Sequence, residues 1–74
     1  AEALGTLTAA NAVSALIGSL SDESVRVRHN ALLSLLKIGG PAAPAAAELR
    51  RALEDENRYV RALSRQTLRA IEKR

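Results

Sequence analysis

Basic side chains recur in the last part of the chain at a spacing that places them on one side of a helix. At about 100° per residue, Arg58, Arg65, Arg69 and Lys73 fall within about 80° of arc on a helix expected from Arg58 to Lys73. Residues 58–74 hold six basic side chains and one acidic side chain. Such a field attracts phosphate backbones, acidic proteins or anionic membrane surfaces. The spacing therefore predicts a basic stripe that could bind an anionic partner.

The other reactive side chains form no catalytic or metal-binding set. His29 is the only histidine, and no second His, Cys or suitably spaced carboxylate accompanies it on its helix. The serines lie outside any G-x-S-x-G elbow, and the GGPAAP stretch lacks the Lys and Ser/Thr of a phosphate loop. We therefore expect a protein that is not an enzyme and that uses no metal and no cofactor.

Length and composition limit the chain to one small all-α domain. A chain of 74 residues has room for only a modest core. Apolar content rests on Ala and Leu, and Tyr59 is the only aromatic residue, which favours helices over strands. There is no Cys for a disulfide framework, and no apolar run reaches the roughly 18 residues of a membrane span. No secretory leader is visible, so we expect a cytoplasmic location.

Two helices are expected before Gly39. The first should run from Thr8 to Leu20, with Thr8 or Asn11 as the N-cap and an apolar stripe of Val13, Leu16, Ile17 and Leu20. In the SDES turn that follows, Ser24 should cap a helix from Val25 to Ile38. This helix has two apolar faces and should therefore be sandwiched: Val27, Ala31, Leu35 and Ile38 on one, and Val25, Leu32 and Leu36 on the other.

Two more helices are expected after Gly39, which should provide a left-handed C-terminal cap. Gly40-Pro41 should form the turn, and Pro44 suits the first turn of a helix that continues through Ala46, Leu49 and Leu53. The stretch Asp55-Glu56-Asn57 repeats the capping turn before the last helix. Helices joined by short turns in this order predict stacked antiparallel hairpins.

A repeat underlies this order of helices. Moving the sequence by 33 residues aligns apolar and charged positions together, in these pairs: Leu16/Leu49, Leu20/Leu53, Asp22/Asp55, Glu23/Glu56, Val27/Val60, Arg28/Arg61, Leu35/Leu68 and Ile38/Ile71. Leu4 and Leu7 stand 31 residues before Leu35 and Ile38, so we interpret residues 1–7 as a partial helix, the remnant of a preceding repeat. A short N-terminal turn that only looks like one is the alternative. Residues 8–39 are then repeat one, and residues 40–74 are repeat two, a C-terminal cap.

The repeat resembles the short HEAT-like repeats named after phycobilisome lyases, whose signature is L-x-x-x-L-x-D-x-x-x-x-V-R-x-x-A-x-x-x-L-x-x-I-G. The first copy carries it as Leu16, Leu20, Asp22, Val27, Arg28, Ala31, Leu35, Ile38 and Gly39. The second carries Leu49, Leu53, Asp55, Val60, Arg61, Leu68 and Ile71, but has Ser64 and Glu72 at the Ala and Gly positions. The resemblance implies the end of an α-solenoid with a right-handed superhelical array, and implies fold more strongly than activity.

The resemblance also implies a role for two Asp/Arg pairs. Asp22 with Arg28, and Asp55 with Arg61, would form a structural ladder that links the turns between helices within and between repeats. The functional alternative is an acid and a cation that wait for a ligand.

The basic stripe has three interpretations. Val25, Leu32 and Leu36 occupy the positions of Arg58, Arg65 and Arg69, and Ile17 occupies that of Arg50. A terminal repeat needs a polar outer face, so the arginines could be a cap. They could also form a cap that binds an acidic protein, or a nucleic-acid site, although only Tyr59 is available for base stacking. Tyr59 could otherwise anchor a peptide at the edge of the solenoid.

These observations predict a non-catalytic protein-binding or scaffolding module at the C-terminal end of a longer array. Binding of nucleic acid or another polyanion through the last helix is one alternative. An accessory part of a chromophore lyase is another, which the family name suggests and no residue supports. The expected partner is another protein, and an acidic protein is one option. Apolar surface at the N-terminal end also predicts self-association there.

Overall fold

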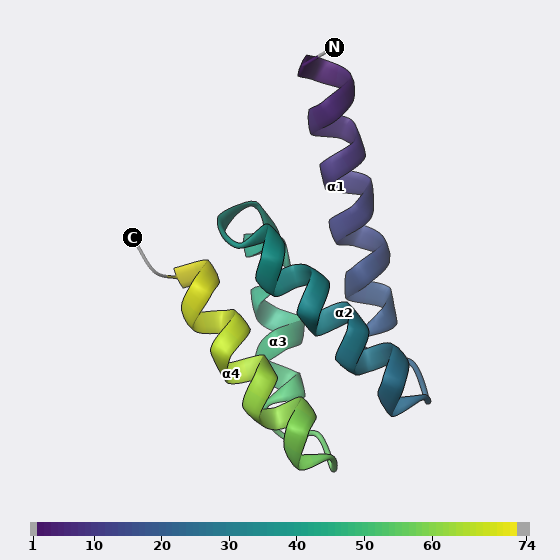
Figure 1. The fold of residues 1–74 in the computed structure, drawn as a ribbon, viewed down its shortest axis with the longest axis vertical. Helices are drawn as coiled ribbons and strands as arrows, with labels where there is room; N and C mark the ends of the chain where they lie inside the picture. The colour runs from purple at the N-terminus through teal and green to yellow at the C-terminus, as the bar shows by residue number, and fades with distance from the viewer. Residues whose placement is uncertain (1, 73–74) are drawn as a thin grey trace.

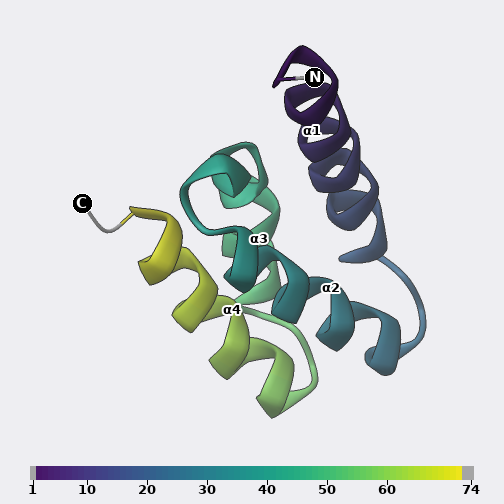
Figure 2. The ribbon, with the colours of Figure 1, turned by 45° about the horizontal axis from the view of Figure 1, so that its top comes forward.

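The computed structural model describes the backbone of residues 2–72 and the side chains of residues 11–72, and this part of the chain contains helices and no strands. The elements are α1 (Glu2–Ser19), α2 (Val25–Ile38), the 3-10 helix η1 (Gly40–Ala45), α3 (Ala46–Ala52) and α4 (Arg58–Glu72). Helices α1 and α2 form one hairpin, α3 and α4 form the next, and α2 and α4 lie side by side with the same direction (Figures 1 and 2). The predicted all-α solenoid architecture is confirmed.

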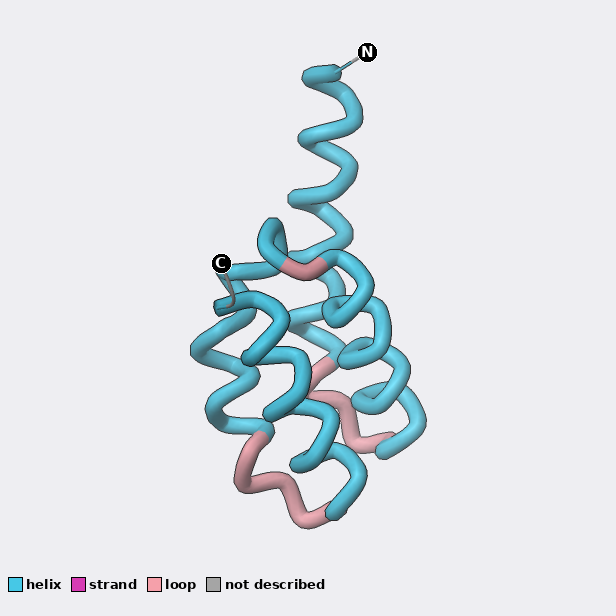
Figure 3. The backbone as a smooth tube through the Cα atoms, turned by 60° about the vertical axis from the view of Figure 1, so that its left-hand side comes forward, coloured by secondary structure: helices cyan, strands magenta, loops and turns pink. Residues whose placement is uncertain are grey.

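Helix α1 is longer than the sequence predicted. It runs without a break from Glu2 to Ser19, so Thr8 and Asn11 lie inside the helix and the prediction that one of them is its N-cap is wrong. The reason is that residues 6–17 contain neither Gly nor Pro and are rich in Ala, the best helix former. The N-terminal part of α1 projects beyond the other helices (Figure 3). The side chains of Leu4 and Leu7 lie outside the described residues, and the remnant of a preceding repeat stays a prediction.

The core lies where α2, α3 and α4 meet. Leu32, Leu35 and Leu49 are fully buried, and Val60 is 1% exposed. Helix α2 is not covered all round as expected, because Val25 and Val27 are each 37% exposed. Val27 of α2 is equivalent to Val60 of α4. Helix α4 has α2 beside it, whereas no helix of the described chain occupies the equivalent position beside α2. Val27 therefore leaves apolar surface on that side of α2.

The turn after α2 depends on the backbone of Gly39. Its φ of 69° has the positive sign that the sequence predicted, but its ψ of −130° lies outside the left-handed helical region. The Gly39 N–H donates to the carbonyl of Leu35 at 2.9 Å and closes the helix. Such a combination of angles is accessible to glycine and strained for residues with a Cβ.

A 3-10 helix replaces the first turn that was expected of the third α-helix. Pro41 and Pro44 both lie in η1, and α3 begins only at Ala46, so the placement of Pro44 in the first turn of an α-helix is wrong. A proline has no N–H and its ring clashes with the preceding helical turn. Two prolines three residues apart therefore favour the tighter 3-10 path over a continuous α-helix.

The two turns between helices share one hydrogen-bond pattern. The Asp22 carboxylate accepts the N–H of Ser24 at 2.8 Å, and the Asp55 carboxylate accepts the N–H of Asn57 at 2.8 Å. The N-caps differ, because Ser24 stands at the cap position of α2 but makes no side-chain cap bond. Asn57 caps α4, and its Oδ1 accepts the N–H groups of Tyr59 at 2.9 Å and Val60 at 3.1 Å. Both aspartates thus accept the amide two residues later in their turn.

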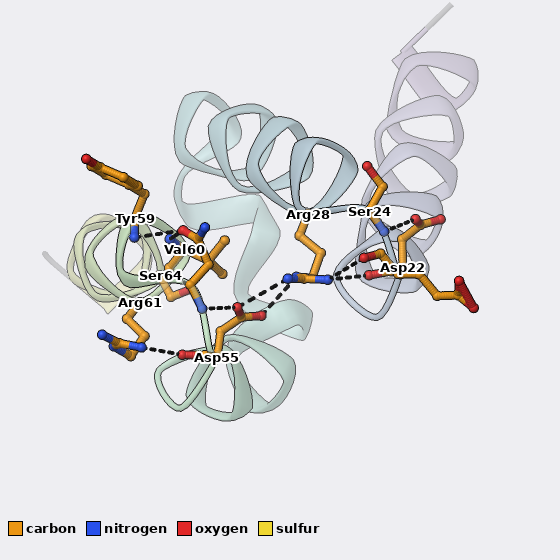
Figure 4. A network of polar contacts seen from close by, with 10 residues as sticks. Asp22, Ser24, Arg28, Asp55, Tyr59, Val60, Arg61 and Ser64 are labelled. Carbon is orange, nitrogen blue, oxygen red and sulfur yellow. Dashed lines mark hydrogen bonds and ion pairs between the residues drawn. The ribbon is translucent and has the colours of Figure 1, made fainter.

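Arg28 joins these two turns (Figure 4). Its Nη1 donates to the main-chain carbonyls of Asp22 at 2.7 Å and Glu23 at 3.1 Å, and its Nη2 donates to Asp55 Oδ1 at 3.3 Å. Arg28 Nε lies 2.9 Å from Asp55 Oδ2, but the N–H is not aligned for a hydrogen bond, so this contact is an ion pair. The Arg28 and Asp55 side chains are only 11% and 13% exposed. Arg28 thus pairs with the carboxylate of the other hairpin and not with that of Asp22.

Replacing Asp55 by Ala should lower the free energy of unfolding by about 2 kcal/mol, because it leaves the Arg28 guanidinium largely buried without its counter-charge. Asp22→Ala is the matched control, since the exposed Asp22 carboxylate accepts only a turn amide; it should cost about 0.5–1 kcal/mol. Urea denaturation of both variants measures the difference. Equal losses would show that the contact between the hairpins adds nothing to stability.

Gly39→Ala should destabilise the fold by about 1–2 kcal/mol, because a Cβ at φ 69° strains the backbone although it meets no neighbour. Gly18→Ala should do the opposite. Gly18 is an exposed residue inside α1 with nothing within 4 Å of an added Cβ, so alanine should stabilise the helix by about 0.5–1 kcal/mol. Thermal melts of the two single variants test the pair, and a shift of the same sign in both would contradict the assignment of strain to Gly39.

Candidate partner-binding surface

The side of α4 that packs inward fixes which side faces solvent. Val60, Ser64, Thr67 and Leu68 are the buried residues of this helix. The two buried hydroxyls are satisfied within the helix, since Ser64 donates to the carbonyl of Val60 and Thr67 donates to that of Leu63, each at 2.7 Å. Buried hydroxyls that bond the preceding helical turn need no partner on another helix. This leaves the opposite side of α4 for charged side chains.

The solvent-facing side of α4 carries four exposed arginines, which we call the basic flank: Arg58, Arg61, Arg65 and Arg69. The structure brings Arg58, Arg65 and Arg69 together as the sequence predicted, opposite the buried Val60 and Thr67. Lys73, the fourth member of the predicted stripe, lies outside the described residues. Arg61 was assigned only to the ladder; its place three residues after Arg58 and four before Arg65 is the signal that adds it to the flank.

The flank occupies the place where the preceding repeat is apolar. Arg65 corresponds to Leu32, which is fully buried between the hairpins, and Arg69 corresponds to Leu36, which is half-buried. Around Arg65 and Arg69 the surface forms an open depression of about 440 Å³, lined also by Ala62 and Gln66. The surface of α4 on which a further hairpin would pack therefore carries arginines where α2 carries leucines.

Ion pairs distinguish the arginines of the second hairpin. Arg50 Nη2 lies 3.1 Å from Glu72 Oε2 on the surface, and Arg51 lies 3.9 Å from Glu48. Among the side chains described, those of residues 11–72, no carboxylate lies within ion-pair distance of the basic flank. Arg61 is held instead by the main chain, because its Nη1 donates to the carbonyl of Asp55 at 2.6 Å. The flank therefore presents four guanidinium groups without a neutralising acid in that part of the chain.

Tyr59 lies beside the flank and not within it. The residue is 66% exposed, and the Arg58 guanidinium carbon lies 5.5 Å from the ring centroid of Tyr59, within the range of a cation–π contact. Tyr59 lines a groove of about 290 Å³ between the N-terminal ends of α2 and α4, together with Val25, Arg26, His29, Asn30 and Asn57. No carboxylate, Cys, Ser or Lys side chain lines this groove with His29. The groups that line the groove therefore resemble no common catalytic set.

Replacing two arginines of the flank by leucine tests whether the flank acts mainly as a polar cover or as a binding site for a ligand. Arg65→Leu with Arg69→Leu should leave the protein folded but make it associate, because it recreates the apolar pair that Leu32 and Leu36 form. Sedimentation velocity measures the change. The control, Arg65→Lys with Arg69→Lys, keeps the charge and should sediment like the parent protein. A Leu variant with the sedimentation of the parent protein would contradict the role of the flank as a polar cover.

Comparison with known families agrees with this architecture. A family profile described as HEAT repeats matches residues 1–69, which include the whole basic flank and both hairpins except the end of α4. No curated protein and no solved structure matches the chain. Within the part of the chain that the structure describes, no helix is long and apolar enough to cross a membrane. The stacked hairpins and the profile that spans them lead to one conclusion: the chain belongs to the family of HEAT-repeat proteins.

Proposed function

We propose that the protein is a non-catalytic binding or scaffolding module that recognises another protein through the basic flank. The observation that carries the proposal is the uncompensated charge of four exposed arginines, two of which correspond to the buried Leu32 and the half-buried Leu36. If the outer surface of α4 only had to be polar, a mixture of acidic and basic residues would suffice. HEAT repeats generally act as protein-interaction or scaffold modules, which supports the same proposal.

Several finer points belong to this proposal and stay predictions. They are the short, phycobilisome-lyase-type class of the repeats, the position of these hairpins at the C-terminal end of a longer array, and a cytoplasmic location. Self-association on the N-terminal side is supported by the exposed Val27 and is expected to be weak, because a single half-exposed valine buries little area. Tyr59 is proposed as a secondary anchor next to the flank, since aromatic residues often anchor interfaces.

A selection from an unbiased library of displayed peptides tests the function. The native protein should enrich peptides that lose at least about tenfold in affinity for the variant Arg58→Gln/Arg65→Gln/Arg69→Gln, since charged groups at an interface contribute on this scale. Random double-stranded DNA is the rival probe, titrated at two salt concentrations. If no enriched peptide depends on the flank, while DNA binds in the micromolar range with a steep loss as salt rises, protein binding is wrong and polyanion binding is supported.

A further inference from the structure

Arg28 and Arg61 are equivalent residues that differ in what they bind. Each donates from Nη1 to the carbonyl of the aspartate six positions earlier, Arg28 to Asp22 at 2.7 Å and Arg61 to Asp55 at 2.6 Å. Arg28 uses its other nitrogens for the Asp55 carboxylate of the next hairpin. Arg61 lies on the far side of Asp55 from Arg28 and is exposed (Figure 4). Arg61 Nη1 is thus held by a main-chain carbonyl, as Arg28 Nη1 is. In Arg28 this bond leaves the other nitrogens directed at a carboxylate.

Two further arginines continue the line from Arg61 along α4. Arg61, Arg65 and Arg69 are four residues apart, so successive guanidinium stems rise by about 6 Å along the helix and lie on one side of it. The corresponding residues of α2 are Arg28, Leu32 and Leu36, and this side of α2 faces the second hairpin. The same side of α4 therefore has the shape that accepts a helix, but with guanidinium groups in place of leucines.

The chemistry of this line selects the partner. A guanidinium whose one edge is fixed binds a carboxylate through its remaining N–H groups with little loss of side-chain entropy. Arg65 and Arg69 line an open depression, so carboxylates on a second helix can reach them without burying an unpaired charge. The flank suits nucleic acid less well than an acidic helix, because it has no aromatic side chain on which bases could stack and Tyr59 lines the neighbouring groove.

We propose that the basic flank binds an acidic α-helical segment of a partner protein, with one carboxylate on Arg61 in the manner of Asp55 on Arg28, and with carboxylates of the following turns on Arg65 and Arg69. The inference rests on the proposed protein-binding function and specifies its partner. The partner helix presents acidic residues at a spacing of three or four, so that they form a stripe complementary to the three arginines.

Two synthetic helical peptides of identical composition test this. Both are alanine-based; one has three Glu residues at positions i, i+4 and i+8, and the other distributes the same residues around the helix. Titration into ¹⁵N-labelled protein, followed on the arginine Nε–H signals at 0.15 M salt, should show the striped peptide binding at least about fivefold tighter. The signals of Arg61, Arg65 and Arg69 should move most.

Matched variants locate the site. Arg61→Gln should weaken binding of the striped peptide about tenfold and Arg61→Lys about threefold, because Lys keeps the charge but loses the two-pronged contact. Arg51→Gln removes the same charge from an exposed residue of α3 beside Glu48 and should change affinity by less than about twofold. If circular dichroism shows that Arg61→Gln is not folded, Arg65→Gln repeats the test, because Arg65 takes no part in the contacts between turns.

Each other outcome overturns the inference. Equal affinity of the two peptides, or equal losses in Arg51→Gln and Arg61→Gln, would reduce the interaction to net charge. Absence of binding at millimolar peptide would remove the site, and tighter binding of a single-stranded oligonucleotide with the same dependence on Arg61 would assign it to phosphates. If the peptide selection still yields ligands that depend on the flank but lack an acidic stripe, the protein-binding function stands and only the acidic helix is wrong.

Discussion

Arg28 is the point at which the two hairpins are bound to each other by polar contacts. Its guanidinium donates to the carbonyls of the first turn and faces the Asp55 carboxylate of the second turn. The side chains of Arg28 and Asp55 are each only about one-tenth exposed. An arginine so placed is tolerated because both Nη groups have acceptors and the Asp55 carboxylate supplies the opposite charge, and its planar fork suits a carboxylate and carbonyls at once. The position of α4 beside α2, and hence the direction of the basic flank, follows from this contact and the apolar core beneath it.

The features that depend on periodicity could be predicted from the sequence. The limits of α2 and α4, the buried Leu35 and Leu49 and the exposed arginines all follow from apolar residues at helical spacing. The start of α1 could not, because a potential N-cap such as Thr8 competes with the helix propensity of the surrounding alanines, and here the propensity prevails. The 3-10 path of η1 was not predicted either, because Pro44 alone suits the first turn of an α-helix and only Pro41 and Pro44 together favour the tighter path.

The candidate surface was predicted in part. The repeat alignment identified Arg58, Arg65 and Arg69 because it compares each with an apolar residue one repeat earlier. The same alignment assigned Arg61 to the contacts between turns, although its spacing from Arg58 and Arg65 also places it with the exposed arginines of α4. Which hairpin provides the carboxylate for Arg28 was likewise beyond the sequence, because Asp22 and Asp55 are equally spaced from an arginine and differ only in three-dimensional position.

The contact surface between α2 and α4 has an uneven composition along its length. Near the turns the hairpins meet in the charged contact of Arg28 with Asp55, whereas both helices otherwise bury apolar residues of the common core, such as Leu35 and Leu68. Apolar burial has no preferred direction, but a guanidinium and a carboxylate must face each other. The ion pair therefore fixes the register of the two hairpins more strictly than the core does.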